Sequence, residues 1–251
     1  MRFRSGRIPF VVALLATLAG CSAFNGGISD EELDREGDYD DLRESNATAR
    51  IDVDSGEFRA VYDLNGTEEV SMYRSSLYQD EPLPIHSVRY WYPNGTEVTG
   101  SELAVEQGQS RTNVQVPDSN GTLAVSGPAG AKTFRLPAFV EGSYDVTIPE
   151  NHRTSNFLFG NVNPGGYDRS IVDDRERLTW DNVDTAVSLR YYHTRDIPLF
   201  LGLVGVVGVL GGAGVAYYYR QVKRLERRRK SMGIDLEADD ETDDESPPGR
   251  P

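Results

Sequence analysis

Cysteine is almost absent from this chain of 251 residues, since Cys21 is the only one. One cysteine cannot form an intramolecular disulfide, so a folded domain must be stable through its core alone. Lysine is also scarce, with Lys132, Lys223 and Lys230 the only three among 26 basic residues. This scarcity, together with a net charge of −14, is typical of halophilic proteins, where molar salt screens charges within about 3 Å. The alternative is an acidic protein from an ordinary mesophilic environment.

Recognisable catalytic motifs are missing as well. The three histidines, His86, His152 and His193, are far apart in the sequence and lack metal-ligand spacing, which favours surface or core imidazoles. The sequence contains no G-x-S-x-G, H-E-x-x-H or P-loop motif. We therefore expect no catalytic residue, no metal and no cofactor. A fold can still assemble a pair of carboxylates from distant residues, as glycosidases do.

The first 20 residues predict a secretory signal peptide. A basic start precedes an apolar run from Ile8 to Ala19, which is too short for a membrane span and ends in small residues. Because Cys21 directly follows Leu18-Ala-Gly, we expect it to become the lipidated N-terminal residue of the mature protein. The alternative is an ordinary signal peptide that happens to contain a cysteine. The acidic, Gly-containing residues 21–44 then predict a disordered tether.

A second membrane element is predicted at residues 197–219, whose apolar stretch is long enough to cross a bilayer as a transmembrane helix, which takes about 20 residues. Three tyrosines end the stretch, and seven Arg and Lys residues follow within residues 220–230. By the positive-inside rule, residues 220–251, a basic segment and a disordered acidic tail, are cytoplasmic and the preceding domain is extracellular. The lipid anchor and the helix agree on this orientation.

Small residues recur along one face of the predicted span. Gly205, Gly208, Gly212 and Ala216 follow one another at spacings of three, four and four. This pattern is typical of helix packing in membranes, with a second copy of the chain or another envelope protein as the partner. Glycine is common in such spans, so ordinary span composition is the alternative.

Residues 45–195 predict an extracellular β-rich domain. Apolar side chains recur at period two in residues 58–64, 88–92, 112–116, 144–148 and 187–191, with glycine-containing turns between them. We expect an all-β fold, an antiparallel β-sandwich-like ectodomain of eight to ten strands, as one domain or two. Residues 22–196 hold 31 acidic and 15 basic side chains, and this charge of −16 excludes nucleic acid as a partner.

Four Asn-x-Thr sequons lie within this domain, at Asn46, Asn65, Asn94 and Asn120. In an exported protein they are candidates for glycosylation, and we expect at least one to be modified. In the last three the asparagine precedes glycine, and Asn-Gly is also the preferred centre of a hairpin turn. The two interpretations are compatible, because a glycan can be attached at a turn.

The order of these elements resembles an uncharacterised family of haloarchaeal membrane-anchored surface lipoproteins. The resemblance covers nearly the whole chain and includes Phe139-Val-Glu-Gly-Ser-Tyr144, Leu189-Arg-Tyr-Tyr192 and the basic stop from Lys223 to Lys230. It implies location and architecture but no activity. We therefore expect a non-enzymatic cell-surface membrane lipoprotein that binds or organises envelope components. The alternative is a surface hydrolase acting on sugars or peptides, which two convergent carboxylates backed by Tyr90 or Trp91 would favour.

Overall fold

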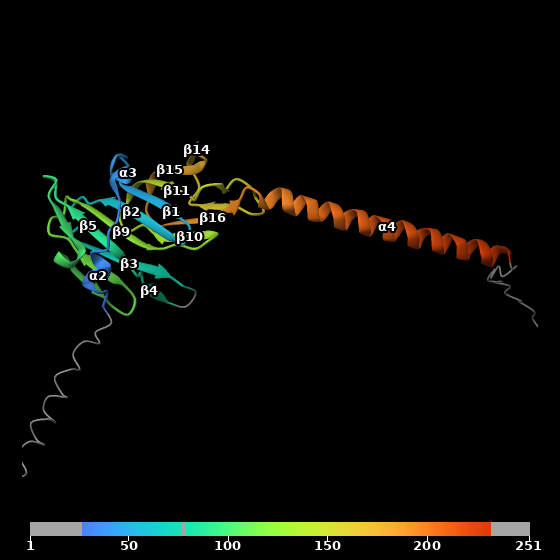
Figure 1. Cartoon of the computed structure of the whole chain (residues 1–251), viewed down its shortest axis with the longest axis horizontal. Helices are drawn as coiled ribbons and strands as arrows, with labels where there is room; N and C mark the ends of the chain where they lie inside the picture. The colour runs from blue at the N-terminus through green and yellow to red at the C-terminus, as the bar shows by residue number, and fades with distance from the viewer. Residues whose placement is uncertain (1–26, 77–78, 232–251) are drawn as a thin grey trace, which may run out of the picture. The chain divides into compact units, whose positions relative to one another are not determined.

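The structure is a computed structural model that describes residues 27–76 and 79–231 (Figure 1). The chain divides between Thr194 and Arg195 into two compact units, a β-rich unit and a helical unit, which are described separately. The predicted signal peptide, Cys21 and the acidic tail from residue 232 lie outside the described residues.

An eight-stranded sheet forms the first layer of the β-rich unit (Figure 1). Its neighbouring strands run antiparallel except for one parallel pair, β1 with β11. The turn between β1 and β2 contains Gly56 at φ +92°, a conformation that favours glycine. Across the sheet the order is β14 (Asp168–Val172), β15 (Arg175–Val183), β11 (Gly142–Thr147), β1 (Ala49–Asp54), β2 (Glu57–Asp63), β9 (Thr122–Pro128), β5 (His86–Trp91) and β6 (Glu97–Thr99).

Three smaller sheets complete the β-rich unit, and side chains from the two larger of them pack against the eight-stranded sheet across a common core. Phe58 of the large sheet meets Phe134 with ring centroids 5.5 Å apart, and Tyr62 meets Phe139 at 6.1 Å. The sheets are β4 (Asp80–Pro82), β3 (Glu69–Ser75), β8 (Thr112–Gln115) and β7 (Ala104–Gln107); β10 (Thr133–Pro137), β16 (Ala186–Arg190) and β13 (Asn161–Asn163); and β12 (His152–Arg153) with β17 (Tyr192–His193). A 3₁₀ turn, η1 (Gly100–Glu102), precedes β7.

The predicted all-β, sandwich-like fold is confirmed. The period-two side chains face the core, as Phe58 and Tyr62 on β2 and Tyr144 and Val146 on β11 show, each at most 1% exposed. The described residues form seventeen strands rather than eight to ten. Several of these strands have two to four residues, which is too short for a period-two pattern to be visible.

Residues 27–44 differ from the predicted disordered tether. α2 (Asp30–Leu33) begins after Ser29, whose hydroxyl accepts a hydrogen bond from the backbone N–H of Glu32, and Leu33 is buried. Arg89 of β5 donates to the carbonyls of residues 33–35 at the end of this helix. α3 (Asp40–Arg43) follows the buried Tyr39. The prediction failed here because the segment is rich in acidic residues. Its two buried apolar side chains, Leu33 and Tyr39, pack the segment against the sheet.

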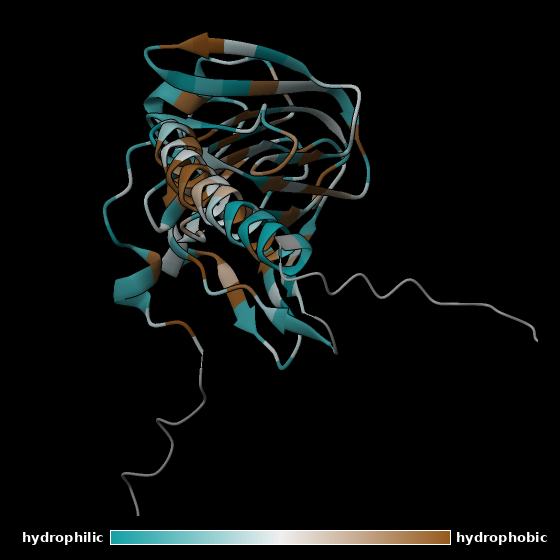
Figure 2. Ribbon diagram, turned by 90° about the vertical axis from the view of Figure 1, so that its right-hand side faces the viewer, coloured by the Kyte–Doolittle hydropathy of each residue, from teal (hydrophilic) through white to brown (hydrophobic). Residues whose placement is uncertain are grey.

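The helical unit consists of α4 (Asp196–Ser231). Its large apolar side chains from Leu199 to Leu225 are exposed, and hydrophilic turns replace apolar ones toward its C-terminal end (Figure 2). Among the described residues it is the one helix long and apolar enough to cross a membrane. The predicted transmembrane segment is therefore helical, and the helix continues through the basic residues that follow it.

Candidate functional site

Charged side chains of both signs cover part of the outer face of the eight-stranded sheet, the face turned away from the common core. β1 alternates Ala49, Ile51 and Val53 in the core with Arg50 and Asp52 on this outer face. The neighbouring strands β2, β11 and β15 place opposite charges beside them, because their register brings outward side chains next to each other. We call this set the Arg–Asp ladder; it comprises Arg50, Asp52, Arg59, Asp63, Asp145, Arg175 and Arg177.

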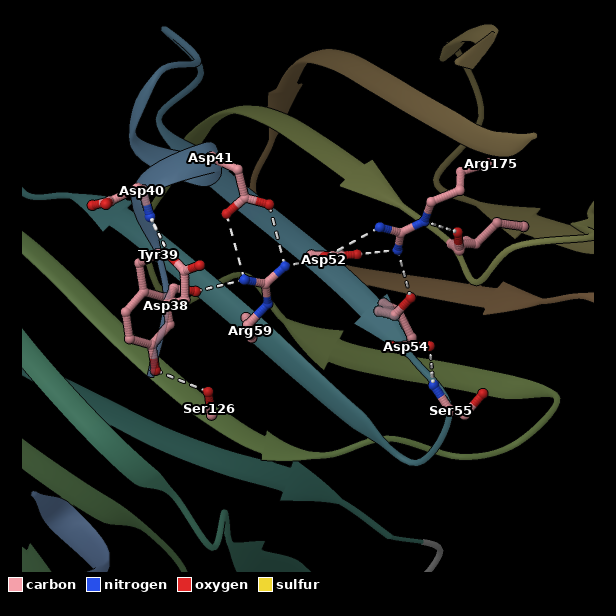
Figure 3. A network of polar contacts seen from close by, with 12 residues as sticks. Asp38, Tyr39, Asp40, Asp41, Asp52, Asp54, Ser55, Arg59, Ser126 and Arg175 are labelled. Carbon is pink, nitrogen blue, oxygen red and sulfur yellow. Dashed lines mark hydrogen bonds and ion pairs between the residues drawn. The ribbon is translucent and has the colours of Figure 1, made fainter. Parts of the chain in front are cut away.

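Asp52 is at the centre of the ladder, where it joins two arginines (Figure 3). One carboxylate oxygen lies 2.5 Å from Nη2 of Arg59, and Arg175 reaches both oxygens. Arg175 also donates to the backbone carbonyls of Val53 and Ile148, each at 3.1 Å. Asp52 is only 5% exposed, so its charge depends on these two guanidinium groups for stabilisation.

Two further pairs extend the ladder. Arg177 donates to both carboxylate oxygens of Asp145, and Ser45 donates to one of them at 3.1 Å. Arg50, 3% exposed, binds both oxygens of Asp63 at 2.7 and 2.8 Å. The hydrogen bond from Arg177 to Asp145 raises the pKa of the Arg177 guanidinium above its usual value. Such two-point contacts between guanidinium and carboxylate fix geometry as well as charge.

The segment around α3 covers part of this face. The Tyr39 hydroxyl donates to the carbonyl of Ser87 at 2.7 Å and lies 2.8 Å from the hydroxyl of Ser126, and its ring packs edge-on against Trp91. Burial raises the pKa of Tyr39 to about 12. Arg59 donates to the backbone carbonyl of Asp38 at 2.5 Å and pairs with Asp41 (Figure 3). Burial alone would lower the pKa of Arg59, but its bonds to Asp52 and Asp41 raise it.

A cavity of about 380 Å³ lies between this segment and the ladder. Its walls include Leu42 and Glu44 on one side and Asp52, Asp145 and Arg175 on the other. The two buried carboxylates that line the cavity, Asp52 and Asp145, are the ones that accept hydrogen bonds from the arginines of the ladder. The arrangement can hold a polar ligand of mixed charge, and the arginines fix the positions of these two carboxyl groups.

The aromatic residues considered for a ligand groove lie elsewhere. Tyr90 is buried in the core, and its hydroxyl donates to the carbonyl of Asp118 at 2.5 Å. Trp91 packs against Tyr39 and donates to Glu97, with the guanidinium of Arg43 4.3 Å from its ring. Neither residue lines the cavity, and both side chains instead pack against other residues of the β-rich unit.

Two of the three histidines are closer together than the sequence indicated. His152 of β12 and His193 of β17 are direct partners in the two-stranded sheet, with ring centroids 5.2 Å apart, whereas His86 lies 3.4 Å from Glu57. No group of three His, Cys, Asp or Glu side chains among the described residues is placed to hold a metal ion. His152 and His193 are 41 residues apart in the sequence, so their spacing gave no indication that the two side chains are neighbours.

All four sequon asparagines, Asn46, Asn65, Asn94 and Asn120, are exposed. Gly66 and Gly95, which follow two of them, have positive φ values of 76° and 85°, as expected in turns. Gly121 has another reason to be glycine, because an added Cβ would lie 2.0 Å from the Tyr90 hydroxyl oxygen. The asparagines are accessible to a glycan, and their modification stays a prediction.

The predicted helix-packing residues Gly205, Gly208, Gly212 and Ala216 lie within α4. All are exposed, and a Cβ added at any of the three glycines meets no atom within 4 Å in the described structure. An added Cβ at these positions therefore meets open space. The packing role of these residues stays a prediction.

Sequence reasoning missed the Arg–Asp ladder, although a signal for it exists. Residues 49–54 alternate apolar and charged side chains, and their charges include both signs; residues 175–177 add three consecutive charged side chains, also of both signs. The pattern indicates strands with a charged outer face, but the pairing between strands depends on register across more than 120 residues.

Comparison with known families gives one match. Residues 45–237 match the family described as "Family of unknown function (DUF5803)". The match covers the β-rich unit from Ser45, the whole of α4 and the start of the tail, so both units belong to one family pattern. No curated protein matches the chain by sequence.

Proposed function

The chain belongs to the DUF5803 family, and we propose that it is a non-enzymatic cell-surface membrane lipoprotein whose β-rich ectodomain binds or organises envelope components. In this proposal the lipid on Cys21 and the span α4 anchor the chain. The β-rich unit faces the outside of a halophilic cell, and residues 220–251 face the cytoplasm. The protein needs no cofactor.

The pairing of the cavity carboxylates with arginine carries the proposal. A glycosidase-type mechanism needs one carboxyl group that gives up a proton and a second that acts as base or nucleophile. Asp52 receives hydrogen bonds from Arg59 and Arg175, and Asp145 from Arg177. Charge-assisted bonds of this kind occupy the carboxylate oxygens and fix their positions, which suits a rigid binding face better than an acid or nucleophile that must contact a substrate.

The charge of the ectodomain indicates what kind of partner fits. Its excess of 16 negative charges favours association with envelope components that present basic groups or a layer of hydrated cations. The exposed Asn46, Asn65, Asn94 and Asn120 offer additional attachment points for glycans, which enlarge the surface of such a module.

A surface hydrolase is the second candidate, because Asp52 and Asp145 line one cavity from two neighbouring strands. Hydrolysis of sugars or peptides by the purified full chain, lost on Asp145→Asn substitution, would favour it. Binding without hydrolysis favours the module.

Crosslinking in intact cells tests the proposal. We expect the wild-type chain to form crosslinked species with envelope components. Replacing Gly208 and Gly212 with leucine fills the small-residue face of α4 while keeping it apolar, so crosslinks that depend on helix packing should diminish at unchanged surface level. Gly214→Leu is the matched control, because residue 214 lies on the opposite face of the helix from Gly205.

Two outcomes limit the proposal. If the crosslinks are the same in wild type, the double variant and the control, assembly runs through the β-rich unit and the glycines are ordinary span residues. If the wild-type chain forms no crosslinked species in intact cells, the binding role is wrong.

A further inference from the structure

The β-rich unit exposes few large hydrophobic side chains, and they come in two pairs of adjacent residues. Among residues 27–76 and 79–194, the exposed large hydrophobic residues are Phe157 (86%), Leu158 (56%), Ile171 (56%) and Val172 (50%). Single exposed apolar residues are common on protein surfaces, but a group of them marks an interaction site.

Phe157 and Leu158 lie in a well-defined loop between β12 and β13. The Asn156 side chain accepts hydrogen bonds from the backbone N–H groups of Leu158 and Phe159, at 2.9 and 3.4 Å. The Phe159 ring packs on Tyr192 of β17, with centroids 6.0 Å apart. The loop is thus held from the inside by Phe159, while its hydrogen bonds fix the turn that presents Phe157 and Leu158 outward.

Ile171 and Val172 end β14, next to the turn at Asp173 and Asp174. The carbonyl of Asp174 accepts hydrogen bonds from the backbone N–H of Asn151, at 3.3 Å, and from the Arg153 guanidinium, at 3.0 Å. Asn151 in turn accepts a bond from the backbone N–H of Thr194 at 2.9 Å. The hairpin tip therefore lies next to the last residue of the β-rich unit.

Both exposed pairs belong to segments whose neighbouring residues lie next to the last residues of the β-rich unit. Phe159 packs on Tyr192, and Asn151 connects Asp174 to Thr194 by backbone hydrogen bonds. Only Arg195 separates Thr194 from the first residue of α4. Two residues of extended chain span at most about 7 Å. If α4 crosses a bilayer, the short connection alone keeps this end of the β-rich unit close to the bilayer surface.

We propose that Phe157 and Leu158, flanked by Ile171 and Val172, insert into the interface of the lipid bilayer that α4 crosses. The proposal rests on the membrane-spanning role of α4 in the proposed function. Aromatic and aliphatic side chains are stable at this depth, about 5–10 Å into the boundary between headgroups and acyl chains. The exposed Asp173 and Asp174 keep the hairpin tip at the water side, so the 155–160 loop makes the deeper contact.

Such a contact gives the β-rich unit a fixed orientation on the membrane. α4 alone is a single connection, about which a domain can turn. A second, apolar contact beside it selects one face of the unit for the lipid and presents the rest to the outside.

Depth-dependent quenching tests the contact on the full chain, reconstituted in vesicles of phosphatidylcholine and phosphatidylglycerol. In a Cys21→Ser background, single cysteines at Leu158→Cys, Val209→Cys or Asn94→Cys carry an environment-sensitive fluorophore. Asn94 is the matched control, because it is exposed in the β5–β6 turn at the opposite edge of the sheet from β14. Lipids with nitroxides at shallow or deep positions then report where each probe lies.

We expect the probe at residue 158 to shift to the blue and to be quenched by shallow nitroxides, the probe at 209 by deep nitroxides, and the probe at 94 by neither. Adding Phe157→Ser should weaken quenching at 158 without changing the circular dichroism spectrum. If 158 behaves like 94 while 209 is deeply quenched, α4 spans the bilayer and the proposed lipid contact is wrong. A blue-shifted but unquenched probe at 158 means a protein partner or a second copy covers the loop, which also overturns it. Absence of quenching at 209 refutes the span and the contact together.

Discussion

Replacing Asp52 with alanine is expected to lower the free energy of unfolding of the β-rich unit by about 3 kcal/mol. The substitution leaves Arg59 and Arg175 without their shared carboxylate, on a face where Asp52 itself is 5% exposed. Removing one member of a buried pair costs more than the pair contributes, because the remaining charge, here on two arginine side chains 29% and 28% exposed, stays largely desolvated. Urea unfolding of the expressed β-rich unit in high salt, followed by circular dichroism, measures the change.

Asp54→Ala is the matched control, because Asp54 lies on the same strand and the same face. It is exposed, and its side chain accepts one bond, from the backbone N–H of the adjacent Ser55 (Figure 3). We expect it to change stability by less than about 0.5 kcal/mol. Equal losses in the two variants would mean that the Arg–Asp ladder adds no stability beyond ordinary surface contacts.

The β-rich unit is expected to lose its structure when molar salt is removed. Residues 22–196 carry a net charge of −16, and the chain has no disulfide to hold the fold against repulsion. Dialysis to about 0.1 M salt lengthens the screening distance from about 3 Å to about 10 Å, so exposed carboxylates begin to repel one another. The β signal in circular dichroism should disappear and return when salt is restored.

The ladder makes this prediction more specific. Partly buried pairs such as Arg50 with Asp63 are screened little by salt, so they hold the sheet similarly in both conditions. The expected loss of structure at low salt must then result from repulsion among unpaired surface carboxylates. A β-rich unit that keeps its full circular dichroism signal at about 0.1 M salt would show that its acidity is unrelated to stability.

The strands with clear alternation were predictable, because a half-buried sheet requires apolar side chains at period two. Residues 58–64 and 144–148 became core strands for this reason. The docking of residues 28–44 was not predictable in the same way. It depends on two apolar side chains, Leu33 and Tyr39, within an acidic segment, and on receiving sites formed by strands far away in the sequence.

The candidate sites were also unpredictable, because they depend on contacts between residues far apart in the sequence. Asp52 and Arg175 are ordinary strand residues in the sequence and become partners only through the parallel pairing of β1 with β11 and the pairing of β11 with β15. Phe157 and Leu158 lie outside the period-two runs, and nothing in the sequence distinguishes them from buried apolar residues. Their exposure results from Phe159, which takes the inner position of the loop against Tyr192.

The central claim is that the β-rich unit lies outside the cell and that α4 carries the chain across the membrane. The three lysines test it directly, because Lys132 lies in the β-rich unit whereas Lys223 and Lys230 follow the apolar part of α4, and all three are exposed. A membrane-impermeant amine reagent applied to intact cells, followed by mass spectrometry, should modify Lys132 alone, and permeabilised cells should show modification at all three. Modification of Lys223 or Lys230 in intact cells, or protection of Lys132 until the cells are permeabilised, would contradict the account.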